Sequence, residues 1–150
     1  SGNPLYYYES IFNFLLGGKE NNPIYSIKFL NLDLENVILN VKKSTIIPKI
    51  IFLQYTDNNT FKKYKNIYIN NINYKLDSIV LRSNNKEHFS CYITCDNLDY
   101  GFDGASNRPL QKFEWKNKIN KNIDFKFRGL PKEINFNFTK GYSIFIYYRN

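Results

Sequence analysis

The chain has 150 residues, of which 43% are hydrophobic and 18% aromatic, and its formal net charge is +8. This length fits one domain, and the apolar content is enough for a packed core. We therefore expect a single folded domain over 1–150 and exclude a disordered chain. No apolar run approaches the roughly 18 residues that a membrane-spanning helix needs, so no membrane partner is expected. Ser1-Gly2 is interpreted as the remnant of a cloning tag.

The N-terminal part carries the helical patterns. Within 6–16, apolar side chains recur at helical spacing, and Gly17-Gly18 predicts the end of that helix. Residues 24–32 are rich in Ile, Tyr and Phe and predict a strand. The spacing of apolar residues in 32–40 favours one or two helical turns.

The rest of the chain is dominated by β patterns. The sequence predicts strands at 49–55, 65–71, 74–82, 88–95, 100–103 and 142–148. In the strand at 74–82 the alternation is strict, so Tyr74, Leu76, Ser78 and Val80 are expected on one face. Short turns join these strands, which predicts an antiparallel sheet with helices confined to the N-terminal part, and hence an α+β domain.

His88 is the single histidine, and it lies where a turn gives way to a strand. Asp103 follows one hairpin later, so the two residues can lie side by side on adjacent antiparallel strands. A carboxylate that fixes the tautomer and orientation of an imidazole forms the general-base half of a nucleophilic site. This spacing alone is weak evidence, because a lone histidine is more often structural.

Four segments, in order and approximate spacing, resemble the ubiquitin-specific proteases. Their sequences here are PKIIFLQY at 48–55, YKLDSIVLRSNNKEHFSCYI at 74–93, YGFDGAS at 100–106 and KGYSIFIYYR at 140–149. They are similar to the family's Pro-Lys strand, its Tyr-x-Leu strand and Gly-His-Tyr strand, its Trp-x-x-Phe-Asp segment and its closing Ala-Tyr-x-Leu-x-Tyr strand. The resemblance implies that His88 matches the catalytic histidine and Asp103 the catalytic acid.

The N-terminal helix pattern extends the resemblance. In the family a helix begins at the nucleophile with Cys-Tyr-x-Asn-Ser, and YYYESIFNFL at 6–15 aligns with it without a gap. Tyr6 then stands at the cysteine position. The resemblance implies a papain-like cysteine-protease-type fold, with this helix packed on an antiparallel sheet and the zinc-bearing fingers absent. It also implies an inactive site, because a phenol with a pKa near 10 cannot replace a thiolate in acyl transfer.

The two cysteines offer no substitute for the missing nucleophile. Cys91 lies three residues after His88 on the same strand, so their side chains are expected on opposite faces, and Cys95 is too far along. Both are interpreted as small buried hydrophobic residues. With no CxxC pair and one histidine, no metal and no cofactor is expected.

The positive net charge is compatible with more than one class of binding partner. A charge of +8 suits an anionic partner such as RNA or an acidic protein face, although the lysines look scattered. The densest basic stretch, at 61–66, is interpreted either as a solvated hairpin or as a contact with RNA or protein. Our leading interpretation is an inactive ubiquitin-specific-protease-like domain that binds a protein partner in a larger complex, with ubiquitin or a ubiquitin-like protein as one candidate. The alternatives are an active deubiquitinating thiol protease whose nucleophile is altered or lies elsewhere, and a basic RNA-associated module. The reduced thiols suit the cytoplasm or nucleus.

Overall fold

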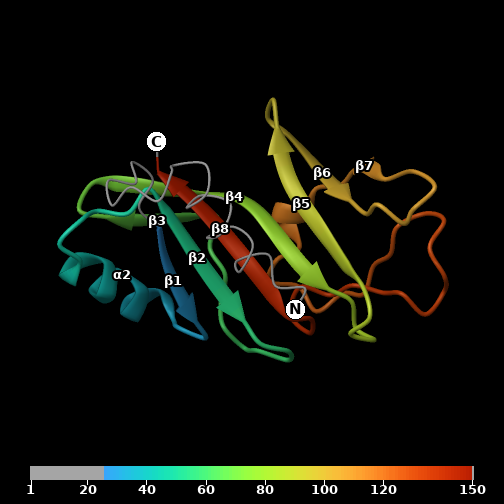
Figure 1. Ribbon diagram of the computed structural model, residues 1–150, viewed down its shortest axis with the longest axis horizontal. Coiled ribbons are helices and arrows are strands. Elements are labelled where there is room, and N and C mark those ends of the chain that lie inside the picture. The colour runs from blue at the N-terminus through green and yellow to red at the C-terminus, as the bar shows by residue number, and fades with distance from the viewer. Residues whose placement is uncertain (1–25, 150) are drawn as a thin grey trace, which may run out of the picture.

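The computed structural model describes residues 26–149, which form an α+β fold built on one mixed sheet of eight strands (Figure 1). The strands are β1 (Ser26–Leu30), β2 (Ile50–Tyr55), β3 (Asn66–Ile69), β4 (Ile72–Arg82), β5 (Phe89–Cys95), β6 (Leu98–Phe102), β7 (Leu110–Lys112) and β8 (Ser143–Arg149). Their order across the sheet is β1-β2-β8-β4-β5-β6-β7, and β3 pairs with β4. The expected helix over 6–16, including Tyr6, lies outside the described residues.

The sheet is mixed rather than antiparallel, because β1 and β2 run parallel. Parallel neighbours need a crossover, and α2 (Leu34–Lys43) supplies it. This helix is longer than the one or two turns predicted. Asp33 caps its N-terminus by accepting a hydrogen bond from the Asn36 backbone N–H at 2.9 Å, and Lys42 and Lys43 occupy its last turn, where cations are favourable.

The strict alternation expected along β4 is wrong because the strand contains an irregularity. The register against β8 shifts between Leu76 and Ser78. Tyr74 and Leu76 therefore share the core face with Ile79 and Leu81, while Val80 lies on the opposite face. A bulge of this kind inverts the inside–outside pattern without breaking the strand.

Aromatic side chains fill the main core on one face of the sheet. Helix α2 contributes Val37 and Val41, and the segment between β7 and β8 contributes buried side chains at Trp115, Ile119, Phe127, Phe136 and Phe138. That segment holds one short 3-10 turn, η1 (Trp115–Asn117), and one isolated β-bridge between Phe125 and Phe136. Of the aromatic residues in the last part of the chain, Phe136, Phe138, Phe145 and Tyr147 are buried, whereas Tyr148 is exposed.

Candidate catalytic pair and its surroundings

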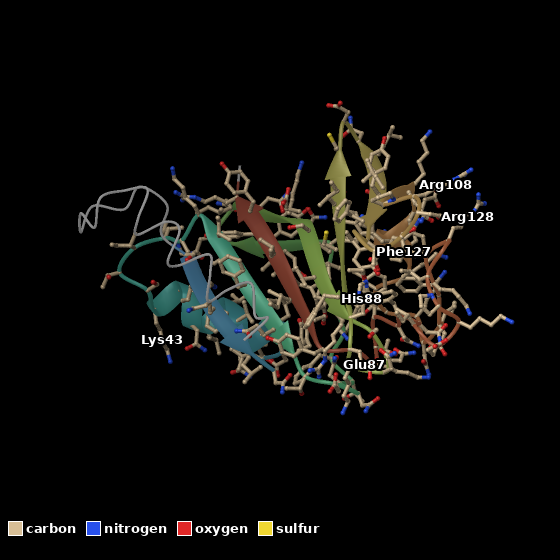
Figure 2. The ribbon with its side chains drawn as sticks, turned by 45° about the vertical axis from the view of Figure 1, so that its right-hand side comes forward. Lys43, Glu87, His88, Arg108, Phe127 and Arg128 are labelled. Atoms are coloured by element: carbon tan, nitrogen blue, oxygen red, sulfur yellow. The ribbon has the colours of Figure 1, made fainter. Side chains whose placement is uncertain are left out.

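His88 stands immediately before β5, at the end of the turn that leaves β4. Ser83 holds it from both sides: its backbone N–H donates to the His88 carbonyl at 2.7 Å, and its hydroxyl accepts from the His88 backbone N–H at 3.1 Å. Lys86 has a φ of 64°, which allows the chain to reverse within so short a turn. The histidine backbone is therefore fixed at the start of β5, which lies between β4 and β6 in the sheet (Figure 2).

Asp103 stands immediately after β6, which pairs antiparallel with β5. Its two carboxylate oxygens lie 2.7 and 2.8 Å from His88 Nε2, so the predicted side-by-side arrangement is confirmed. The Asp103 side chain is fully buried, whereas that of His88 is 26% exposed. The backbone N–H of Ala105 also donates to Asp103 Oδ1 at 3.0 Å, which holds the carboxylate in place.

This geometry fixes which ring nitrogen of His88 carries the hydrogen. A carboxylate is an acceptor, so Nε2 is the donor and Nδ1 holds the lone pair whenever the ring is neutral. Within residues 26–149, Nδ1 has no hydrogen-bond partner. The pair therefore presents a base oriented by an acid. The Phe136 ring lies beside the imidazole in a tilted arrangement, with 6.3 Å between the ring centroids.

Neither cysteine completes this pair. Cys91 is half-buried, and its thiol faces the Phe102 carbonyl at 3.9 Å. Burial, followed by the charge of Asp103, raises the pKa of the Cys91 thiol, which is the opposite of what a nucleophile needs. Cys95 is exposed at the far end of β5, so the expectation that both cysteines are buried is wrong. The exposure follows from its place beside a two-residue turn, where Asp96 and Asn97 both have positive φ.

The hairpin predicted at 61–66 is not simply solvated, because Lys63 is only 3% exposed. Its ammonium donates to Asn59 Oδ1 at 2.5 Å and lies 5.0 Å from the centroid of the Tyr55 ring. Asn120 holds the Lys63 backbone, accepting from its N–H and donating to its carbonyl at 2.8 Å each. Burial lowers the pKa of the Lys63 side chain from 10.5 to about 8.

The depressed pKa of Lys63 predicts a pH dependence of stability. Between about pH 8 and 10.5 the unfolded chain binds more protons at this lysine than the folded chain, so stability rises with pH across that window. From pH 7 to 9.5 the free energy of unfolding should increase by about 2 kcal/mol relative to Lys63→Met. Urea denaturation of both proteins at the two pH values measures this difference, and parallel pH profiles would contradict the assigned burial.

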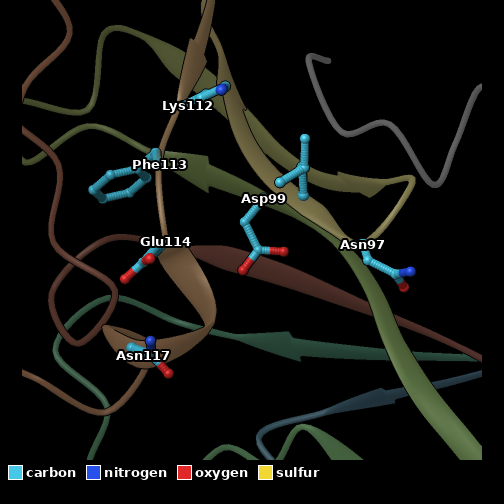
Figure 3. Close-up of a pocket in the computed structure, with 7 residues that line it drawn as sticks. Asn97, Asp99, Lys112, Phe113, Glu114 and Asn117 are labelled. Atoms are coloured by element: carbon cyan, nitrogen blue, oxygen red, sulfur yellow. The ribbon is translucent and has the colours of Figure 1, made fainter.

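Two surface hollows lie away from the catalytic pair. One, of about 340 Å³, is lined by Asp99 and Glu114 together with Asn97, Lys112 and Asn117 (Figure 3). The other, of about 320 Å³, lies at Lys63 and is lined on its far side by Asn120 and Thr139. Sequence reasoning missed both hollows. The hollow at Lys63 joins segments about 60 residues apart, and the hollow at Asp99 depends on how the start of β6 packs against the chain after β7. Sequence reasoning also missed Ser83 and Ala105, although each is close in the chain to the residue that it binds, because the motif comparison considered only His88 and Asp103 themselves.

Comparisons with known proteins leave the family open. No protein family and no curated protein sequence matches the chain. Among solved structures, one described as an essential yeast splicing factor is similar over 88% of this chain and 32% of its own, at 11% identity and a TM-score of 0.46. The chain thus spans about a third of that protein, and a likeness of this size carries no conclusion about function. Within residues 26–149, no helix has the length and apolar character needed to cross a membrane.

Proposed function

We propose that the chain is a ubiquitin-specific-protease-like domain of papain-like architecture, catalytically inactive, which serves as a protein-binding or scaffold module. The observation that carries the proposal is the His88–Asp103 pair, in which the carboxylate lies 2.7 Å from the imidazole and orients it as a base. Neither cysteine of residues 26–149 is placed to be activated by this base. In the sequence alignment with the family, Tyr6 occupies the nucleophile position.

The arrangement of the family-like segments supports the same proposal. The segments at 48–55 and 140–149 contain β2 and β8, the segment at 74–93 covers most of β4 and β5, and the segment at 100–106 covers the end of β6. In the sheet, β8 lies between β2 and β4, and β5 lies between β4 and β6. The segments that resemble the family therefore form one continuous part of the sheet. The histidine and the acid lie at neighbouring strand ends, before β5 and after β6.

A scaffold role suits the state of this site better than catalysis. Acyl transfer needs a nucleophile that the base can activate, and a tyrosine phenol has neither the acidity nor the leaving-group properties. The net charge of +8 also opposes tight binding of ubiquitin, because the resemblance implies that family members present acidic residues to ubiquitin's positive surface. The partner we favour is therefore another protein of a larger assembly.

A ubiquitin C-terminal electrophile tests the absence of activity. The wild-type chain should form no more covalent adduct at neutral pH than a Cys91→Ser/Cys95→Ser variant, because neither thiol has a base beside it. An active deubiquitinating protease serves as the reagent control. Stoichiometric labelling of either cysteine, read by intact-protein mass spectrometry, would overturn the inactive assignment and favour a working thiol protease.

A further inference from the structure

Two lysine-rich segments that are far apart in the chain lie side by side. They are FKKYKN at 61–66 and WKNKINK at 115–121, and together they contain six lysines and no acidic residue. Asn120 binds the Lys63 backbone through two hydrogen bonds of 2.8 Å, and the Lys65 ammonium donates to Asn117 Oδ1 at 2.9 Å. These paired lysine segments concentrate charge that looks scattered along the sequence.

Most of this charge is free to meet a partner. Lys62, Lys65 and Lys121 are exposed, and Lys118 is half-buried. Aromatic rings support two of these ammonium groups without neutralising them: Lys62 lies 5.3 Å from the Tyr64 ring centroid and Lys118 lies 5.8 Å from that of Phe113. Lys116 is the exception, because Asp99 lies 3.9 Å from its ammonium.

The hollow at Lys63 lies within this surface. Its polar lining comes from Asn59, Thr60, Lys62, Lys63, Asn120 and Thr139. Within residues 26–149, no carboxylate lies within 4.0 Å of the Lys63 ammonium, whose one hydrogen-bond acceptor is the neutral amide of Asn59. A buried ammonium without a counterion is unfavourable, so an anionic group that enters this hollow gains an unusually strong electrostatic partner.

The composition of the surface distinguishes between anionic partners. Protein interfaces are depleted in lysine and enriched in arginine and aromatic anchors, yet the paired lysine segments contain no arginine, and Trp115 is buried. Nucleic-acid phosphates are contacted by lysine together with the amides and hydroxyls of asparagine and threonine, which are the groups present here. We propose that the paired lysine segments bind the phosphodiester backbone of a nucleic acid, with one phosphate in the hollow at Lys63.

The salt dependence of RNA binding tests this proposal. The probe is a fluorescent 12-nucleotide oligouridylate, followed by anisotropy from 50 to 200 mM salt. With about four or five phosphates neutralised, the slope of log Kobs against log salt should be about −3. Replacing Lys62, Lys65, Lys118 and Lys121 by glutamine should weaken binding by more than about tenfold and leave a slope of about −0.7, the part contributed by Lys63. Lys63→Met should make the slope about 0.7 less negative.

The matched control removes the same charge elsewhere. Lys42, Lys43, Lys75 and Lys132 are exposed, and glutamine at these four positions should change the affinity less than about threefold. Circular dichroism and urea denaturation confirm that each variant is folded. Equal losses in the two quadruple variants, or binding that does not depend on salt, would overturn the proposal. A dodecaglutamate peptide bound as tightly as the RNA would overturn it too, in favour of an acidic protein.

Discussion

Gly141→Ala is expected to lower the free energy of unfolding by about 3 kcal/mol or more. A Cβ at Gly141 would lie 2.1 Å from the Arg82 carbonyl oxygen and 3.0 Å from a methyl group of Leu81. The first contact is with backbone, so it can be relieved only by moving β8 away from β4. That movement weakens the hydrogen bond from the Arg82 N–H to the Tyr142 carbonyl, now 2.8 Å long.

A second glycine provides the matched control for Gly141. At Gly104 an added Cβ meets nothing closer than the Phe102 ring, at 3.9 Å, which is an ordinary contact. Gly104→Ala should therefore change the free energy of unfolding by less than about 0.5 kcal/mol. Urea denaturation of the two variants gives both values. Equal effects would mean that β4 and β8 do not approach each other at Gly141 as described.

Trp115→Ala is expected to cost about 3–5 kcal/mol of the free energy of unfolding. The side chain is fully buried, its ring lies 6.4 Å from that of Tyr92 between centroids, and its indole N–H donates to the Ile93 carbonyl at 3.0 Å. It thus anchors the segment from 115 to 121 beneath β5. Alanine removes both the packing and the hydrogen bond, and leaves a cavity that the surrounding aromatic rings cannot fill.

A phenylalanine at position 115 separates the loss of packing from the loss of the indole hydrogen bond. Trp115→Phe keeps most of the packing but leaves the Ile93 carbonyl without its indole donor, which should cost roughly 1–3 kcal/mol. Both variants lack the single tryptophan, so tryptophan fluorescence cannot report their unfolding. Their thermal unfolding is therefore compared with that of the wild type by circular dichroism. An alanine variant no less stable than the phenylalanine variant would contradict the buried position of Trp115.

The sequence predicted the parts of the fold that depend on local pattern. Strands at 49–55, 74–82 and 142–148 are rich in β-branched and aromatic residues, and they are confirmed as β2, β4 and β8. The closeness of His88 and Asp103 was also predictable, because one tight hairpin separates their strands and fixes the pairing of β5 with β6.

Features set by distant contacts were not predictable in this way. The parallel direction of β1 and β2 follows from the crossover through α2. The elements predicted at 24–32, 32–40 and 49–55 have the required order, but their residues do not show that the two strands are neighbours. The bulge after Leu76 reverses the exposed face of β4. Its local sign is the polar pair Asp77-Ser78 followed by three apolar residues, which the alternation assumed for this strand overlooked. Lys63 is buried because Asn120, 57 residues away, holds its backbone against the sheet, so its burial could not be read from a polar, basic stretch.

We propose that His88 and Asp103 form the base of a thiol-protease-type site in which Tyr6 stands at the nucleophile position. It is tested by the rate of iodoacetamide alkylation of Tyr6→Cys at pH 7, in a Cys91→Ser/Cys95→Ser background, with and without His88→Ala. An imidazole held by Asp103 should stabilise the thiolate, so we predict at least about a tenfold faster reaction when His88 is present. Equal rates in the two folded proteins would contradict the claim.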